Sequence, residues 1–240
     1  MMMSDRRLEN QHNSILSRVG ALAVFLGALG VSFGLITAGQ SGAPPRAGQI
    51  FPEHTPRDEW QKPVEIIEAL DLKPGDTVAD IGAGAGYFTG WLSQAVGPQG
   101  QVYAVDISEE AIRLLNNKIG FYPIKNIKPV LCTESDLKLP PQSLDLAFLL
   151  NTFSVVEEKE TMLANVMTAL KDRGRLALID WNSTKNGPPG PPRDNRMSED
   201  RVVKMAEQTG LRLLRRHEML PSQYFLEFGK NGRRRNTAFK

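Results

Sequence analysis

Along residues 59–230, short apolar runs typical of strands alternate with segments that have the pattern of helices. Short apolar runs predict strands at 77–81, 101–106, 128–132, 144–150 and 175–180. The run Leu144 to Leu150 is almost wholly apolar, as is typical of a strand buried on both faces of a sheet. Helices are expected before, between and after these strands, at 63–70, 87–96, 108–119, 161–170 and 198–209. This alternation indicates a parallel sheet with helices on both faces.

The end of this region has a different pattern. Residues 211–220 and 223–228 form two strand-like runs separated by Pro221 and Ser222, and together they predict a terminal antiparallel hairpin. We therefore expect an α/β fold: a Rossmann-like, doubly wound, seven-stranded and mostly parallel sheet with an antiparallel C-terminal hairpin strand. Ser108 and Ser198 are expected to cap helices, and Arg173-Gly174 to end one.

An apolar segment precedes this region. Val19 to Ala38 lacks charged residues and is long enough to cross a hydrocarbon core of about 30 Å as a helix. We expect one transmembrane helix there, and a cleaved secretory signal is the alternative, because small residues follow at Thr37-Ala38-Gly39. Arg6, Arg7 and Arg18 favour a cytoplasmic N-terminus with the body on the far side of the membrane, and a reversed topology is the alternative.

The expected organisation is a polar tail at 1–18, a membrane anchor at 19–38, a Pro/Gly linker at 39–58, a folded domain at 59–230 and a basic tail at 231–240. The 240 residues carry a net charge of +2. The basic tail is expected to be a solvated end, and no nucleic-acid partner is expected. With one cysteine and three scattered histidines, the chain has neither a disulfide framework nor a cysteine-built zinc site.

Two features at strand ends carry the chemistry. The loop Asp80-Ile-Gly82-Ala-Gly84-Ala-Gly86 follows the first strand, and its glycines let a ligand approach the backbone closely. Asp106 ends the second strand, where a carboxylate can accept hydrogen bonds from the ribose hydroxyls of a nucleoside. The carboxyl ends of the parallel strands are therefore the expected ligand site.

The spacing of the glycines bears on which nucleoside binds. The fingerprint of dinucleotide sites is G-x-G-x-x-G, whereas this loop reads G-x-G-x-G. The preceding acid, Asp80, disfavours a pyrophosphate and suits a ligand that carries an ammonium group.

At these residues the chain resembles the class I S-adenosylmethionine-dependent methyltransferases. VADIGAGAGYFT is similar to the first motif of that family and VYAVDIS to its second. SDLKLPPQSLDLAFLLNTF resembles the adenine-side loop and fourth strand, and LKDRGRLALIDW resembles the turn and fifth strand. The similarity covers roughly Trp60 to Lys230.

The resemblance implies S-adenosyl-L-methionine as the cofactor and assigns roles to individual residues. Gly82, Gly84 and Gly86 would line its methionine and ribose portions, with Asp80 nearby. Asp106 would hold the ribose hydroxyls and Ile107 would cover one adenine face. Asp136, with Glu134 or Ser135 as alternatives, would approach the adenine amine, and Asn151 would lie near the methyl group.

The methyl acceptor is less defined. The loop 151–155 lacks the histidine that many small-molecule methyltransferases carry there, so Glu157, Glu158, His217 and Tyr224 are alternative candidates for a general base. Trp60 and Trp181, again with Tyr224, are candidates for the wall of a substrate pocket. Asn151, Asp180 and Asn182 include only one charged group, so no metal site is expected.

The sequence thus favours a membrane-anchored enzyme that transfers a methyl group from S-adenosylmethionine to a small-molecule or lipid-like acceptor, with its oligomeric state open. Two alternatives remain: an NAD(P)-dependent oxidoreductase on the same type of fold, and a catalytically silent, cofactor-binding membrane adaptor.

Overall fold

The computed structural model describes residues 55–122, 124–185 and 190–231. These residues belong to one compact unit. The helices are α1 (Pro56–Gln61), α2 (Pro63–Leu70), α3 (Thr89–Val96), α4 (Glu109–Phe121), α5 (Lys159–Ala169) and α6 (Glu199–Gln208), with short 3-10 turns η1 (Phe153–Val155) and η2 (Arg193–Asn195). The strands are β1 (Thr77–Ile81), β2 (Gln101–Asp106), β3 (Ile127–Leu131), β4 (Leu144–Leu150), β5 (Leu170–Trp181), β6 (Leu211–His217) and β7 (Gln223–Lys230).

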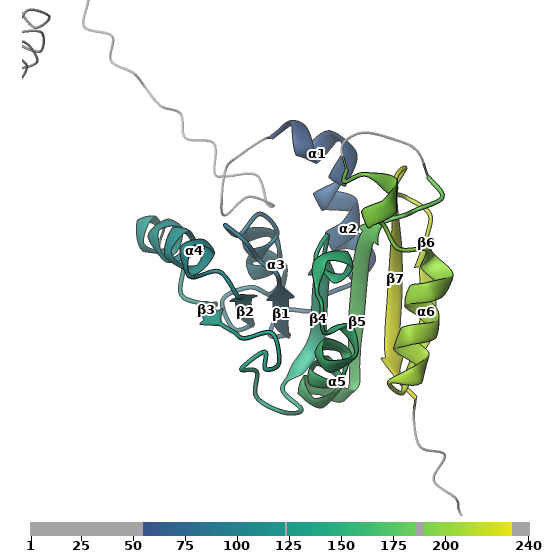
Figure 1. Ribbon diagram of the computed structural model, residues 1–240. Coiled ribbons are helices and arrows are strands. Elements are labelled where there is room, and N and C mark those ends of the chain that lie inside the picture. The colour runs from purple at the N-terminus through teal and green to yellow at the C-terminus, as the bar shows by residue number, and fades with distance from the viewer. Residues whose placement is uncertain (1–54, 123, 186–189, 232–240) are drawn as a thin grey trace, which may run out of the picture. The chain divides into compact units, whose positions relative to one another are not determined.

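The seven strands form a single sheet in the order β3-β2-β1-β4-β5-β7-β6 (Figure 1). The first five in chain order are parallel, and β7 runs antiparallel to both β5 and β6. The expected α/β fold with a closing antiparallel hairpin is confirmed. Because the chain order reverses beside β1, a crevice opens at the carboxyl ends of the central strands, where ligands bind in folds of this type.

Alternating side chains divide the core into two layers. Val78, Leu146 and Ala177 belong to a buried cluster with α2, α3 and α4. Ala79 and Ala147, one residue further along their strands, belong to a second buried cluster with α5 and α6. Successive strand residues point to opposite faces, so continuous apolar runs are what a sheet covered on both faces requires.

Several predicted elements have the bounds that the sequence indicated. Helix α2 and strands β1, β2 and β4 begin and end at the predicted residues. Ser108 caps α4, with its hydroxyl accepting from the Ala111 N–H at 3.2 Å. Ser198 is the N-cap residue of α6, as predicted, but its side chain makes no capping hydrogen bond.

The boundary between α5 and β5 also differs from the prediction. The helix ends at Ala169, and Arg173-Gly174 lies within β5, which begins at Leu170. The β4–β5 pairing shifts register between Leu144 and Leu146. A Cβ at Gly174 would come within 2.6 Å of the Leu144 carbonyl oxygen. The glycine therefore permits a close backbone approach inside the sheet rather than stopping a helix.

Helix α1 lies partly in the segment expected to be linker. Thr55 and Asp58 form a capping box, and Pro56 occupies the first turn. The sequence Thr-Pro-Arg-Asp contains this signal, but the surrounding prolines and glycines masked it. In Figure 1, α1 lies beyond α2 at one end of the sheet.

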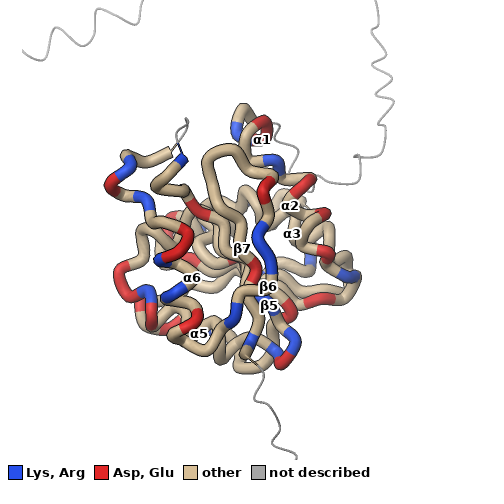
Figure 2. Tube along the Cα trace, turned by 90° about the vertical axis from the view of Figure 1, so that its right-hand side faces the viewer, with Lys and Arg blue, Asp and Glu red and all other residues tan. Residues whose placement is uncertain are grey.

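The outer strand of the hairpin, β6, carries charged side chains that protect this edge of the sheet from pairing with another chain. β6 carries Arg212, Arg215 and Arg216, and Figure 2 shows this basic stretch along the edge of the sheet. Charged side chains on an edge strand oppose pairing with another chain. One of them, Arg216, pairs with Glu199 at 2.5 Å.

The predicted membrane span, the first part of the linker and the basic tail lie outside the described residues. Within the described part of the chain, no helix is both long enough and apolar enough to cross a bilayer.

Candidate functional site

The glycine loop after β1 depends on backbone conformations that other residues rarely adopt. Gly82, Gly84 and Gly86 have φ values of +76°, +54° and +83°. An added Cβ at Gly82 would lie 2.2 Å from the Thr152 hydroxyl oxygen, and one at Gly86 would lie 2.6 Å from Leu115. Two of the three glycines are therefore required by space as well as by φ.

Asp106, at the end of β2, faces this loop. Its carboxylate accepts the Gly84 N–H at 2.8 Å and the Ser108 N–H at 2.9 Å. An ionised carboxylate has about four lone-pair positions, so further hydrogen bonds can still be accepted. The structure thus places the acid and the glycine loop against each other.

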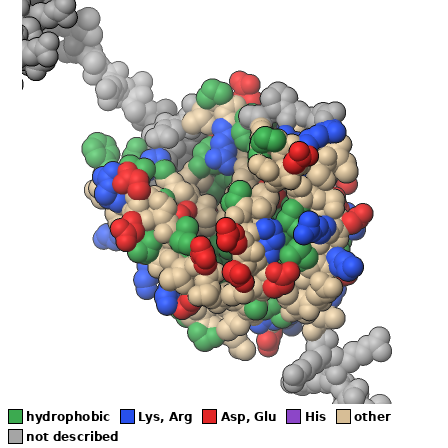
Figure 3. Space-filling model, viewed as in Figure 1, with side chains coloured by type: hydrophobic (Ala, Val, Ile, Leu, Met, Phe, Trp, Pro, Cys, Tyr) green, Lys and Arg blue, Asp and Glu red, His purple; other side chains and the backbone are tan. Residues whose placement is uncertain are grey.

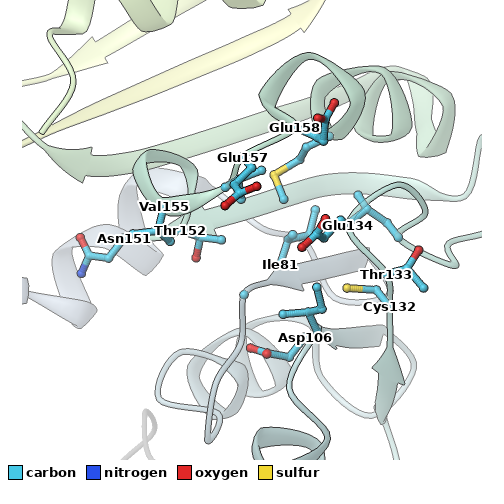
Figure 4. A pocket seen from close by; sticks show the side chains of 15 residues that line it. Ile81, Asp106, Cys132, Thr133, Glu134, Asn151, Thr152, Val155, Glu157 and Glu158 are labelled. Carbon is cyan, nitrogen blue, oxygen red and sulfur yellow. The ribbon is translucent and has the colours of Figure 1, made fainter. Parts of the chain in front are cut away.

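A pocket of about 410 Å³ opens beside them. Figure 4 shows the side chains that line it, which come from the ends of β1, β2 and β4, from the segment after β3 and from the segment leading into α5. Ile107, Cys132 and Leu137 contribute apolar surface to the lining, and Asn151 and Thr152 contribute polar groups. The mixture of apolar walls with a few polar groups is typical of small-molecule sites.

The structure brings together five of the nine predicted site residues. Those that line the pocket are Gly82, Asp106, Ile107, Glu134 and Asn151. Gly84 and Gly86 of the glycine loop and Asp80 of β1 do not line this pocket.

Asp136 is placed elsewhere. It is bound to Lys138, whose backbone N–H and ammonium donate to its two oxygens at 2.8 and 2.6 Å. These hydrogen bonds hold the pKa of the Asp136 carboxyl below its ordinary value. Asp136 is absent from the pocket lining, whereas Glu134, the alternative named beside it, lines the pocket.

Asp80 lies beneath the loop and is almost fully buried. The Thr89 hydroxyl donates to its carboxylate at 2.6 Å. Burial raises the pKa of Asp80 to about 6, and the charge of Asp106 adds to this shift, while the hydrogen bond from Thr89 and the charge of Arg57 oppose it. The ionisation of a buried acid with this pKa is favoured by any cation that approaches it.

Asn151 follows β4 in a left-handed conformation, with φ 55°. Asparagine tolerates this region better than most residues, because its side chain can bond locally. Its carboxamide contacts Gln61 of α1 and Gln223 of β7. Neither glutamine was predicted as a site residue, since nothing in the local sequence links them to position 151.

The other candidates divide between the pocket and the interior. Glu157 and Glu158 line the pocket. His217 hydrogen-bonds to the buried Glu227 at 2.6 Å and stacks on Phe225. The Tyr224 hydroxyl is buried without a partner among the described residues, and burial raises its pKa.

The remaining candidates pack together or bond locally. The rings of Trp60 and Trp181 pack against each other at an angle of 35°, with centroids 5.4 Å apart. The Asp180 carboxylate accepts hydrogen bonds from Ser154 and from the Trp181 N–H. The Asn182 side chain accepts hydrogen bonds from Thr184.

Replacing Gly82 by alanine should destabilise the domain by about 3 kcal/mol, because a positive φ and an overlap with Thr152 act together. Gly75 is the matched control: its φ is +94° but its Cβ would enter open space, so Gly75→Ala should cost about 1 kcal/mol. Urea unfolding of the two variants would check this, and equal losses would show that the contact with Thr152 contributes nothing.

Asp80→Asn should change how stability depends on pH. The folded pKa is about 6 against an ordinary 3.8, so the native state holds its proton longer than the unfolded state. Stability that is present below pH 4 is therefore lost as pH rises through 6, by about 3 kcal/mol in total. The asparagine can still accept from Thr89 but does not ionise. The free energy of unfolding of Asp80→Asn, relative to that of the wild type, should increase as the pH is raised from about 4 to about 7.5. A difference between the two proteins that does not change with pH would contradict this.

Comparisons with known proteins agree with this geometry. A protein-family model described as a methyltransferase domain matches residues 79–176. The solved structure of a SAM-dependent methyltransferase from Aquifex aeolicus is 31% identical, with a TM-score of 0.68, over 72% of this chain and 91% of that one.

Curated relatives match over shorter regions. The ubiquinone/menaquinone biosynthesis C-methyltransferase UbiE of Teredinibacter turnerae is 28% identical over 130 residues, which are 53% of this chain and 51% of that protein. An arsenite methyltransferase of Halobacterium salinarum is 28% identical over 109 residues, which are 45% of this chain and 28% of that protein. The chain thus spans about half, or less, of the length of these curated relatives. On the Aquifex likeness and the matched domain, the chain belongs to the family of SAM-dependent methyltransferases, whose cofactor is S-adenosylmethionine.

Proposed function

We propose that this protein transfers the methyl group of S-adenosylmethionine to a small-molecule or lipid-like acceptor by direct in-line displacement. The observation that carries the proposal is the contact between the glycine loop and Asp106 at the edge of the pocket, a hydrogen bond of 2.8 Å from the Gly84 N–H. A bare backbone turn in contact with a carboxylate one strand away suits a nucleoside whose ribose lies against both.

The described residues can be assigned to the parts of the cofactor. Asp106 would accept the ribose hydroxyls, and Ile107, which is 55% exposed, would cover one face of the adenine. Glu134 replaces Asp136 as the preferred partner of the adenine amine. Gly82 would line the amino-acid portion of the cofactor, and Asn151 would lie near its methyl group.

The chemistry asks little of the protein beyond positioning. The bound sulfonium supplies an activated methyl group and a leaving group, and the electron pair of the broken carbon–sulfur bond stays on sulfur. The chain must hold the acceptor in line and, where the acceptor arrives protonated, take its proton. Glu157 and Glu158 are the carboxylates after β4 that line the pocket, so they are the candidates for that proton transfer.

The nature of the acceptor is supported by the pocket rim. Val155 is 73% exposed and lines the pocket with Val156 and Met162, so the entrance presents apolar surface to solvent. The curated relative from Teredinibacter is named for the biosynthesis of ubiquinone and menaquinone. A hydrophobic ring or lipid-like acceptor is therefore our preferred class.

The assignment of Asp106 is tested by calorimetry with S-adenosylhomocysteine. Asp106→Ala should weaken binding about tenfold to a hundredfold, since it removes a charged hydrogen-bonding group from the pocket. Asp136→Ala is the matched control and should bind like the wild type, because its carboxylate is bound to Lys138 away from the pocket. Equal affinity of the wild type and Asp106→Ala would refute the ribose assignment.

A parallel titration with NADH and a methyl-transfer assay separate the two alternatives. Binding of NADH without binding of S-adenosylhomocysteine would favour the oxidoreductase. Cofactor binding without methyl transfer to a panel of quinol and phenol acceptors would favour the silent adaptor.

Membrane attachment through Val19 to Ala38 is part of the proposal and rests on the sequence alone. The full chain should stay with membranes after an alkaline carbonate wash. Leu26→Arg should release a large fraction, because a central arginine costs about 2.5–3.5 kcal/mol in a membrane helix, whereas Leu8→Arg should not. A soluble, shortened chain would show instead that the segment is a cleaved signal.

A further inference from the structure

Three carboxamide side chains from distant parts of the chain form a closed hydrogen-bonded ring. Gln61 Nε2 donates to Gln223 Oε1 at 2.8 Å, Gln223 Nε2 donates to Asn151 Oδ1 at 2.5 Å, and Asn151 Nδ2 donates to Gln61 Oε1 at 3.4 Å. They belong to α1, to the start of β7 and to the residue after β4. Both glutamines are at least 98% buried.

Arg57 fixes the direction of this ring. A carboxamide can turn over and exchange its oxygen and nitrogen, so a ring of three amides can run in either sense. The Arg57 Nη2 donates to Gln61 Oε1 at 3.3 Å, and a guanidinium has no acceptor. The oxygen of Gln61 must therefore face Arg57, which turns its nitrogen to Gln223 and in turn sets the other two amides.

Arg57 is itself held in place. Its guanidinium lies over the Tyr87 ring, 4.0 Å from the centroid. Tyr87 directly follows the glycine loop, and its hydroxyl donates to Asp58 of α1 at 2.5 Å. A cation over an aromatic face gains electrostatic stabilisation. The segment after the glycine loop thus anchors the residue that orients the ring.

The ring acts on the pocket through Asn151. Its backbone is fixed by φ 55° and by donation of its N–H to the Ile179 carbonyl at 2.8 Å. Of the three residues, Asn151 is the one that lines the pocket, and Figure 4 shows its side chain at one end of the row of lining side chains. The ring uses one hydrogen of its Nδ2 and one lone pair of its Oδ1, so a second hydrogen and a second lone pair remain for a ligand.

We propose that Gln61 and Gln223 are positioning residues, which hold the Asn151 carboxamide in one orientation so that its remaining hydrogen-bonding capacity is offered to the molecule bound in the pocket. The identity of that molecule as S-adenosylmethionine or its product rests on the proposed function. A preorganised amide pays less entropy on binding than one that must first be ordered.

The test is a double-mutant cycle in the affinity for S-adenosylhomocysteine, measured by calorimetry on the full chain. Gln223→Met keeps the length of the side chain but removes the donor to Asn151, and Asn151→Ala removes the amide that is positioned. Each single variant should weaken binding about threefold to tenfold. The double variant should bind no more weakly than Asn151→Ala alone, because Gln223 acts only through Asn151.

Gln94→Met on α3 is the matched control. Gln94 lies outside the pocket, and its Oε1 is buried without a partner among the described residues. The Gln94→Met variant should therefore bind S-adenosylhomocysteine with the affinity of the wild type. Thermal unfolding verifies that each variant is folded. If Gln223→Met does not fold, Gln223→Glu replaces it in the cycle, since a carboxylate can accept from Gln61 but cannot donate to Asn151.

The outcomes are distinct. Losses that add up in the double variant would show a merely structural role and overturn the inference, as would wild-type affinity in Gln223→Met. Failure of the wild type to bind S-adenosylhomocysteine at all would instead overturn the proposed function.

Discussion

The hydrogen bond from the Gly84 N–H to the Asp106 carboxylate joins the two loops on which the site depends. It can form because β1 and β2 are parallel neighbours in register, with Ile81 opposite Val105, so that both strands end at the same edge of the sheet. The Gly82 and Ala83 N–H groups complete the junction by donating to the Val105 carbonyl. Strand pairing thus determines where the loop and the acid meet, and the residues after each strand supply the chemistry.

The other side of the pocket is built by contacts of much longer range. β4 lies next to β1, and Thr152 after β4 occupies the space that a side chain at position 82 would need. Asn151 is then tied to α1 and β7 by the amide ring. The pocket therefore depends on the first and last elements of the domain as well as on the glycine loop, and disturbance at either end of the fold can reach the bound molecule.

This division explains what the sequence could and could not predict. Buried parallel strands appear as continuous apolar runs, so β1, β2 and β4 were predicted to the residue, and the glycine loop and Asp106 follow directly from those strand ends. Gly174 was misjudged because a glycine that ends a helix and a glycine that admits a neighbouring backbone look alike in one dimension.

The amide ring lay beyond sequence reasoning for a physical reason. Gln61 and Gln223 are 162 residues apart, and glutamine is ordinarily a surface residue, so neither composition nor spacing connects them. Asp136 and Glu134 were both considered for the adenine amine. Their local sequence cannot separate them, because what distinguishes them is whether Lys138 binds the carboxylate.

The charge of the pocket lining distinguishes between the two cofactors considered for this fold, a dinucleotide with a pyrophosphate and S-adenosylmethionine. Asp106, Glu134, Glu157 and Glu158 line the pocket, and none of the described residues lining it is a lysine or arginine. Figure 3 shows acidic side chains gathered near the middle of the face seen in that view. A pyrophosphate placed among these carboxylates would be repelled, with no cation in the lining to offset it, whereas a sulfonium with an ammonium group is attracted. Asp80 beneath the loop adds to this preference as it ionises above about pH 6. The electrostatics of the pocket therefore disfavour a dinucleotide independently of the glycine spacing, and both arguments support the same cofactor.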